Sequence, residues 1–407
     1  MISVGEARRT ILQNVSLLDA EEVPLLQGMG RVIREDVLAP WDIPSADCSA
    51  MDGFAFSSAS LGGTKLRVGG MLPAGAQSIH AVAEGEAVRI MTGAPIPAGC
   101  DTVVPFEEVV EEGDTITLKG KARQGAHIRR KGENVAARDK VIAAGTLLRP
   151  PEIGMLASLG KASVRVYRKP EVAILATGDE LVPIGSVPGP GATVNSNSYS
   201  LASQVMEAGG TPILLGIARD NQDATREMIA KGLTADFLVT TGGVSIGDRD
   251  FVKEIITELG GEIKFWKINL KPGKPFAFAL YRGKPVFALP GNPVAAMVTF
   301  ELFVRPAMLK MMGHTRLFRP VVKATLIEPL RNKGDRPLFV LSRVKLQEGR
   351  YSVSSTGQQN SANLMTMYEA SGLLELKPQT GASPGDEVEV TLYDREFEMR
   401  EECHVAD

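Results

Sequence analysis

Short apolar runs alternate with amphipathic stretches between residues 170 and 316. EVAILAT, PILLGIA and DFLVTT are apolar at nearly every position, which is typical of strands buried on both faces. NSYSLASQVMEAGG, NQDATREMIAKGL and DFVKEIITELGG space their apolar residues three and four apart, as amphipathic helices do. This alternation predicts a doubly wound α/β domain. EIKFWKINL, PFAFALY and PVFALP predict further strands, and PVAAMVTFELFVRPAMLKMM predicts one long helix.

On both sides of this region the pattern is mostly that of short β-strands, apart from a helix near the start of the chain. Residues 2–18 predict a helix. Between 44 and 134, short β-like segments such as GEAVRIM and DTVVPFEEVV are separated by glycine and proline, which predicts a small β domain. Residues 317–407 include FVLSRVKLQEG, RYSVSST and EVEVTLYD, and predict a second β region.

Composition narrows the function classes. A chain of 407 residues is expected to form two to four domains. A net charge of −3 gives no reason to expect nucleic-acid binding, and no apolar run reaches the ~18–20 residues of a membrane span. The three cysteines, Cys48, Cys100 and Cys403, form no close pair and no metal-ligand spacing, so isolated thiols of a cytoplasmic protein are expected.

Polar motifs recur where the predicted strands of the α/β region end. They are Thr177-Gly178-Asp179-Glu180, Arg219-Asp220, TTGGVSIGDRD at 240–250, Lys271-Pro272-Gly273-Lys274-Pro275 and Pro290-Gly291-Asn292-Pro293. In open α/β sheets, ligands bind outside the carboxyl ends of the strands. The repetition therefore predicts a pocket at one edge of the sheet.

The residue types in these loops favour an anionic ligand. Gly242, Gly243 and Ser245 offer backbone N–H groups and a hydroxyl. Lys271 and Lys274 bracket a stiff turn, and like charges so placed often bind a polyanion, although a solvated basic turn is also common.

Two acids of the same loops suggest a hard cation. Asp220 and Asp250 would repel a phosphate unless a cation such as Mg²⁺ lay between them. Asp250 is equally well placed to cap the helix that follows it.

Gly243-Val244-Ser245-Ile246-Gly247 also matches the G-x-S-x-G turn of hydrolases that use a serine nucleophile. Such an enzyme needs an acid and a histidine downstream. Only His314 and His404 follow, so this reading is disfavoured.

Seven motifs in register resemble the MoeA/gephyrin E-domain family, the molybdopterin molybdenumtransferases. They are SAMDGFA, IMTGAPIP, RRKGEN, ATGDEL, TTGGVSIGDRDF, LKPGKPFAFA and LPGNPVAA, from about residue 49 to 296. The resemblance implies four domains. These are a discontinuous domain I (1–43 and 135–169), a β-rich insertion domain II (44–134), an α/β molybdopterin-binding-like domain III (170–316) and a C-terminal β-barrel-like domain IV (317–407).

The same resemblance implies an activity and an assembly. Adenylylated molybdopterin and molybdate would react with Mg²⁺ to give molybdenum cofactor and AMP. The family forms homodimers whose active site lies between domains III and IV of one subunit and domains I and II of the other. Contacts with the adenylyltransferase and with apo-molybdoenzymes are also implied, with no nucleic-acid or membrane partner.

Residue roles follow from the matching motifs. Lys271 and Lys274 are implied for oxyanion binding, and Arg343 and Ser361 for molybdate. The other implied site residues are Asp52, Thr92 and Glu180 of the functional cleft, Asp220 and Asp250 at the metal, and Gly242, Gly243, Ser245, Pro290, Asn292 and Pro293 for substrate. Asn134 stands where related sequences have an acid, which puts any catalytic role of that acid in doubt.

Two alternatives remain at this stage. A molybdopterin adenylyltransferase resembles the α/β region alone, and the motifs SAMDGFA and MTGAP argue against it. A scaffold that binds a partner peptide is the other. The sequence does not distinguish molybdate from tungstate as the anion.

Overall fold

The structure is a computed structural model that describes residues 1–62, 65–76, 81–219, 221–243 and 251–399. The chain divides into two compact units. The larger comprises Met1–Glu22, Gly30–Arg34 and Arg165–Asp407, and the smaller comprises Val23–Met29 and Glu35–Val164. The chain crosses from one unit to the other within two short strands. They are β1 (Ala20–Pro24) and β12 (Ser163–Tyr167). The four predicted domain boundaries remain predictions.

The larger unit contains a six-stranded sheet. Its order is β16 (Thr211–Ala218), β13 (Glu171–Thr177), β17 (Phe237–Thr241), β20 (Lys284–Leu289), β19 (Ala277–Tyr281) and β18 (Glu262–Trp266). The first four strands are parallel, and β19 runs antiparallel to both of its neighbours, β20 and β18. Arg282 and Gly283 both have positive φ, as a two-residue hairpin between antiparallel strands requires.

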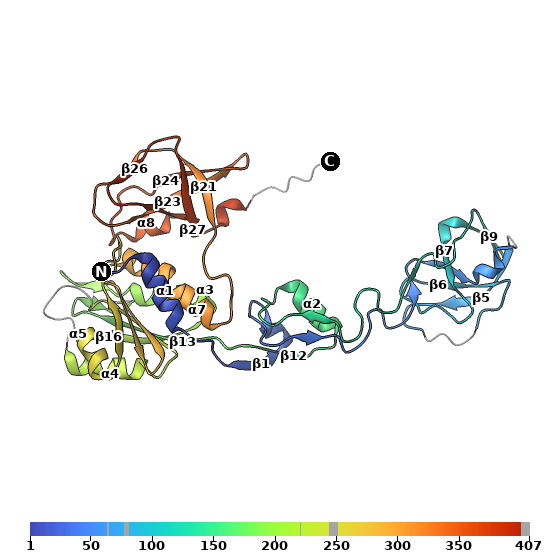
Figure 1. Ribbon diagram of the computed structural model, residues 1–407, viewed down its shortest axis with the longest axis horizontal. Coiled ribbons are helices and arrows are strands. Elements are labelled where there is room, and N and C mark those ends of the chain that lie inside the picture. Colours follow the sequence, from blue (N-terminus) through green and yellow to red (C-terminus); the bar gives the residue numbers. More distant parts are fainter. Residues whose placement is uncertain (63–64, 77–80, 220, 244–250, 400–407) are drawn as a thin grey trace. The chain divides into compact units, whose positions relative to one another are not determined.

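Helices cover both faces of this sheet (Figure 1). Val172 and Ile174 of β13 face the core shared with α1 (Val4–Asn14) and α3 (Asn197–Glu207). Ala173 and Leu175 face the core shared with α4 (Gln222–Gly232) and α5 (Phe251–Glu258). A strand buried on both faces needs apolar residues throughout, which is why EVAILAT has no polar alternation. The doubly wound α/β fold predicted from sequence is confirmed.

The predicted long helix is one helical run with a break inside it. It consists of α6 (Pro293–Thr299), a π-helical turn (Phe300–Val304) and α7 (Arg305–Met311). Pro306 has no N–H, so it cannot bond to the carbonyl of Leu302 as an α-helix requires. That carbonyl instead accepts a hydrogen bond from Arg8 Nε at 3.3 Å, which joins α1 to the helix.

The C-terminal region of the larger unit forms a closed barrel, and this prediction is also confirmed. Its strands, in order, are β21 (Val321–Leu326), β24 (Arg350–Ser355), β23 (Leu338–Gln347), β25 (Gly372–Leu376) and β27 (Glu387–Leu392). Leu326, Val340, Val353 and Val390 fill its interior. Helix α8 (Leu364–Tyr368) and a small sheet of β22 (Leu330–Asn332) and β26 (Thr380–Ala382) complete it.

The smaller unit is mostly β-structure. Its largest sheet has the order β7 (Thr102–Pro105), β4 (Gly53–Phe56), β6 (Glu86–Ile90), β5 (Lys65–Leu72), β9 (Thr115–Leu118) and β8 (Val109–Glu112). Phe54, Phe56, Leu66 and Ile116 form its core. The remaining elements are β2 (Val37–Leu38), β3 (Cys48–Ser49), β10 (Ile128–Arg129), β11 (Lys140–Ile142) and α2 (Pro150–Ser158). Among the described residues of the chain, no helix combines the length and apolar character needed to cross a membrane.

Candidate functional site

The predicted loops gather at one edge of the α/β sheet. Thr177 pairs with Ala218, and Thr241 pairs with both Ala176 and Leu289, so four parallel strands end at the same level. Strand β19 runs the other way and starts at this edge, which brings the preceding residues 271–275 to it. Register therefore explains why motifs far apart in sequence meet.

Glycines are required where these loops touch. Gly242 has a φ of +90°, and a Cβ there would lie 2.4 Å from the carbonyl oxygen of Thr177. Gly243 has a φ of +64°, and its Cβ would lie 2.8 Å from Thr177 Oγ1. The two glycines let the chain after β17 pass against the end of β13.

Side-chain hydrogen bonds fix the neighbouring turn. Asn197 at the start of α3 donates from Nδ2 to Thr241 Oγ1 at 2.8 Å and to the carbonyl of Gly291 at 2.7 Å. Thr241 Oγ1 donates in turn to the carbonyl of Pro290 at 2.9 Å. The strand ends and the α6 start thus form one connected wall.

A cavity of about 540 Å³ opens between this wall and the barrel. The α/β domain contributes Glu180, Lys271 and Lys274, and the barrel contributes Arg336 and Ser361. Other lining residues are Thr177, Gly178, Gly242, Gly243, Pro290, Asn292, Gln359 and Asn360. Of the predicted substrate residues, Pro293 is not among them: it begins helix α6 instead.

The two lysines have no acidic partner among the residues that the structure describes. Within the described part of the chain, neither Lys271 nor Lys274 has a side-chain hydrogen bond or ion pair. Among the described residues, the Arg336 guanidinium has two partners. It donates a hydrogen bond to the carbonyl of Leu270 at 3.3 Å, and it forms an ion pair of 3.7 Å with the exposed Asp335. Ammonium groups in a cavity without an acidic partner favour binding of an anion.

One acid lines the same cavity. The carboxylate of Glu180 folds back over Gly178, where an added Cβ would lie 2.4 Å from Glu180 Oε2. Among the described residues, no donor is hydrogen-bonded to this carboxylate. Glu180 is therefore available as an acceptor for a ligand with N–H groups.

Backbone contacts join the basic loop to the barrel. Lys271 N–H donates to the carbonyl of Pro337 at 2.9 Å, and Phe339 N–H donates to the carbonyl of Lys271 at 2.8 Å. On the other wall, Ser361 accepts from Asn292 Nδ2 at 2.8 Å and from Val294 N–H at 3.0 Å, the latter at its carbonyl. Ser361 thus lies at the cavity, and its implied role in binding molybdate stays a prediction.

The arginine at the cavity is Arg336, whereas sequence comparison singled out Arg343. Arg336 lies two residues before β23, at the mouth of the barrel. Arg343 lies within that strand, is exposed, and pairs with Glu369. In the sequence, Arg336 is simply part of a charged turn, Gly334-Asp335-Arg336-Pro337. Its place at the cavity becomes visible only from the position of that turn in the fold.

Two predicted residues meet in the smaller unit. Asp52 Oδ1 accepts hydrogen bonds from Thr92 N–H at 2.7 Å and Thr92 Oγ1 at 2.8 Å. They meet because β4 and β6 are paired, with Gly53 opposite Ile90. These donors lower the pKa of the Asp52 carboxyl, which is therefore ionised near neutral pH.

Asn134, the departure from the family pattern, is held in place by a backbone hydrogen bond. Its N–H donates to the carbonyl of Ile43 at 3.1 Å. The preceding Arg130 and Lys131 pair with Asp47 and Asp42, at 2.6 and 3.3 Å. Charges in this loop are thus satisfied within the smaller unit.

Three predicted site residues, Ser245, Asp220 and Asp250, lie outside the described residues. The described ranges contain no group of three histidine, cysteine, aspartate or glutamate side chains arranged to hold a metal. The predicted magnesium ligands remain a prediction.

Known families match the chain along most of its length. Residues 2–160 match the MoeA N-terminal region (domain I and II), residues 173–310 match a "Probable molybdopterin binding domain", and residues 323–393 match the MoeA C-terminal region (domain IV). A Nostoc sp. protein named molybdopterin molybdenumtransferase is 35% identical, over 95% of this chain and 93% of its own. The chain belongs to the MoeA family.

Further relatives agree with this MoeA assignment. A molybdopterin molybdenumtransferase of Staphylococcus aureus is 33% identical, over 96% of this chain and 95% of its own. A crystal structure of the molybdopterin biosynthesis MoeA protein from Pyrococcus horikoshii aligns with a TM-score of 0.82 and 31% identity. It covers 97% of this chain and all of that one. The matches outside residues 173–310 disfavour the single-domain adenylyltransferase alternative.

Proposed function

We propose that this protein is a molybdopterin molybdenumtransferase that inserts molybdenum from molybdate into adenylylated molybdopterin and releases AMP. The observation that supports this most is the cavity at the sheet edge, where Lys271 and Lys274 carry positive charge that no described residue pairs with. The substrates are a dianion and a pyrophosphate ester, and both need cationic partners.

The cavity residues divide the binding between them. Lys271, Lys274 and Arg336 attract the anions, while Ser361 and Asn292 offer polar groups on the opposite wall. The side chains hold the reacting oxygens together and neutralise charge that develops as the phosphoanhydride bond breaks. This chemistry requires no protein nucleophile.

Glu180 has a different role in the same proposal. Its unpaired carboxylate accepts hydrogen bonds, whereas the other charged groups lining the cavity donate them. The aminopyrimidinone edge of a pterin presents adjacent N–H donors that one carboxylate can accept together. Glu180 would therefore orient the pterin, and Gly178 leaves the space in which its carboxylate lies.

A magnesium requirement is part of the proposal. Asp220 and Asp250 would supply the carboxylate ligands, and the bound ion would neutralise pyrophosphate charge. Activity is then expected to fall on chelation and to return with added Mg²⁺. Full activity in a magnesium-free, chelator-treated preparation would remove this part of the account.

Homodimer formation, cytoplasmic location and contact with apo-molybdoenzymes are proposed on the family relationship alone. In the proposed dimer, Asp52 and Thr92 of one subunit complete the cavity of the other. Mixing inactive Asp52→Ala with inactive Lys271→Ala should then restore up to about one quarter of wild-type activity, since half of all dimers are mixed and each mixed dimer carries one intact site of its two. No recovery after subunit exchange would argue against a shared site.

The direct test is reconstitution of a molybdoenzyme from adenylylated molybdopterin and molybdate. Lys271→Ala should lose about 100-fold or more in rate, the usual loss for a donor to the transition state. Lys323→Ala, which removes an exposed lysine of the barrel, should behave as wild type. If the pure protein instead adenylylates molybdopterin with ATP, the adenylyltransferase alternative is favoured.

A further inference from the structure

The shape of the cavity depends on how the barrel sits on the α/β domain. Its two walls belong to different domains and meet at the contacts of Lys271 with Pro337 and Phe339, and of Ser361 with Asn292 and Val294. These groups line or border the cavity, so a ligand competes with water and protein for them. Contacts elsewhere must help to hold the walls in place.

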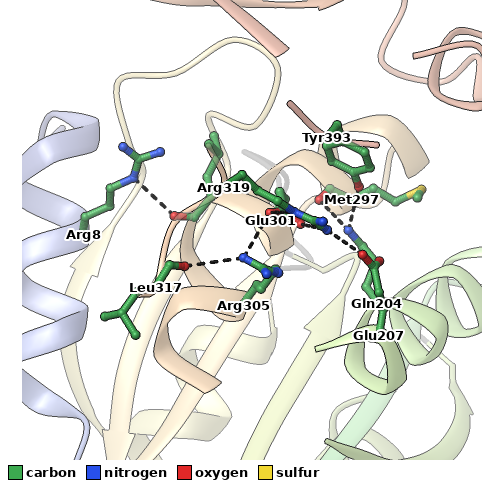
Figure 2. A network of polar contacts seen from close by, with 10 residues as sticks. Arg8, Gln204, Glu207, Met297, Glu301, Arg305, Leu317, Arg319 and Tyr393 are labelled. Atoms are coloured by element: carbon green, nitrogen blue, oxygen red, sulfur yellow. Dashed lines mark hydrogen bonds and ion pairs between the residues drawn. The ribbon is translucent and has the colours of Figure 1, made fainter. Parts of the chain in front are cut away.

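A second set of contacts joins the same two domains away from the cavity lining. Arg319 lies in the segment between α7 and β21, and its Nε donates to Glu301 Oε1 at 2.9 Å. Its Nη2 donates to Glu207 Oε1 at 2.6 Å (Figure 2). The linker into the barrel is thus fastened to two helices of the α/β domain.

The end of the last barrel strand is fastened at the same place. Gln204 Nε2 donates to the hydroxyl oxygen of Tyr393 at 2.9 Å and to the carbonyl of Met297 at 3.2 Å (Figure 2). The Arg319 guanidinium lies over the Tyr393 ring, 5.6 Å from its centroid. We call Gln204, Glu207, Glu301, Arg305, Arg319 and Tyr393 the linker cluster.

The charges of the linker cluster balance one another around a buried carboxylate, Glu301, whereas Glu207 at the edge of the cluster is exposed. Glu301 is only 6% exposed, and it lies between Arg319 and Arg305, the latter 3.7 Å away. Burial lowers the pKa of Arg319, but hydrogen bonds to Glu301 and Glu207 outweigh it and raise that pKa overall. Two arginines and two glutamates neutralise each other, which suits a structural contact and leaves no charge for a ligand.

One helical run connects the linker cluster to the cavity. Val294, which bonds Ser361 at the cavity, and Glu301 lie on the same run of α6 and the π-helical turn. Seven residues separate them, about 10 Å along the axis at 1.5 Å per residue. The barrel and the linker that leads into it therefore contact the same helical run at two places, the barrel at the cavity and the linker at Glu301.

We propose that Arg319 is a positioning residue for the cavity. By holding the linker and Tyr393 against Glu301 and Glu207, it sets the distance between the barrel wall, with Arg336 and Ser361, and the lysines of the opposite wall. In linking this to anion binding, the inference rests on the proposed function. The positioning itself has a structural readout that does not depend on activity.

The test compares Arg319→Gln with Arg168→Gln. The control removes another arginine of the larger unit, which pairs with Asp236 at 2.6 Å and is not a cavity residue. Both variants should lose thermal stability. Only Arg319→Gln should speed hydrogen exchange in the peptides containing Phe339 and Val294, and raise the KM for molybdate by about tenfold with a smaller change in kcat.

Two further variants keep the test decisive. Arg319→Lys retains a charge for Glu301 and should recover part of the lost molybdate affinity. Tyr393→Phe removes only the hydroxyl bonded to Gln204. It should speed hydrogen exchange at Phe339 and Val294 and raise the KM for molybdate, each by less than Arg319→Gln does. This variant still provides the test if Arg319→Gln does not fold.

The outcomes separate this inference from the proposed function. Unchanged exchange at Phe339 and Val294 in both Arg319→Gln and Tyr393→Phe would overturn the positioning role. If wild-type protein shows no molybdate-dependent activity, the proposed function fails, while the exchange measurement still decides the role of Arg319.

Discussion

Two pairs of basic side chains in the larger unit differ in what surrounds them. Lys271 and Lys274 line the cavity, and within the described residues no acid pairs with them. Arg305 and Arg319 lie in the linker cluster, where Glu301 and Glu207 neutralise them. Paired charge fastens domains together, whereas unpaired charge is left for a ligand. The comparison indicates function more clearly than the number of basic residues does.

The two pairs also arise differently in sequence. The cavity lysines come from one stretch of five residues, Lys271–Pro275, which contains no acid. The linker cluster draws on residues more than a hundred positions apart, from α3 to the segment before β21. A local motif is visible in a sequence, and a cluster of this kind appears only when the chain is folded.

Removing both cavity lysines should give the largest effect on function. Lys271→Ala with Lys274→Ala is expected to lower the rate of molybdenum insertion by well over about 100-fold, because at least two anion contacts disappear. The unfolding midpoint should stay within a degree or two of wild type, since neither side chain has a partner to lose in the described part of the chain. Reconstitution kinetics and thermal unfolding measure the two quantities. A double variant that folds normally and remains active would break the comparison.

Breaking the linker cluster should give the largest effect on stability. Glu301→Gln leaves Arg319 and Arg305 without their shared carboxylate, and removing one partner of a buried pair costs about 3 kcal/mol or more. Urea unfolding measures this loss. In the double variant with Arg319→Gln the loss should be smaller than the sum of the two single losses, because the two residues share one contact. Strict additivity would show that they act independently.

The glycine turn at the cavity offers a test of shape without charge. Gly242→Ala should destabilise the protein by about 2 kcal/mol or more, because it combines a positive φ with a clash against the Thr177 carbonyl. Gly283→Ala has a similar φ of +80° but open space around its Cβ, so its loss should be about 1 kcal/mol. The difference between the unfolding midpoints of the two variants measures the cost of the clash at Gly242. Equal losses would mean that the turn relaxes and that close approach is not required.

Salt should separate the two groups of charges. Molybdate binding to the cavity lysines is expected to weaken severalfold between 50 mM and 500 mM sodium chloride, because these groups are accessible to counterions. The stability difference between wild type and Glu301→Gln should change little over that range, since Glu301 is buried. Titration calorimetry and urea unfolding at both salt concentrations provide the data. A salt-independent affinity for molybdate would contradict the cavity assignment.

The smallest effect is expected in the smaller unit. Hydrogen bonds from Thr92 lower the folded-state pKa of Asp52 below its usual 3.8. Their stabilising contribution is therefore complete above that value and is lost as the pH falls through the lowered folded pKa. Thr92→Val should raise the Asp52 pKa toward its usual value and slightly lower stability near pH 7, where the contribution is complete, while the two proteins become equally stable below the lowered folded pKa. NMR titration of the carboxyl carbon measures the pKa directly.

Sequence patterns predicted much of this fold and only part of its site. Apolar runs and helical periodicity located the α/β strands, because buried strands need apolar residues on both faces. The break in the long helix depends on Pro306 and on Arg8 from a distant helix, so periodicity could not show it. Glycine and lysine motifs at strand ends identified one wall of the cavity. Arg336 of the other wall was missed, because its place depends on where β23 begins.

The most direct test of the central claim is a crystal structure with tungstate, whose anomalous scattering locates a tetrahedral dianion without ambiguity. The account predicts a peak in the cavity, with oxygens within about 3 Å of Lys271 and Lys274 and on the side facing Arg336 and Ser361. The linker cluster should bind none, although it contains two arginines. A peak at Arg305 and Arg319, or an empty cavity at saturating tungstate, would contradict the claim that unpaired charge marks the site.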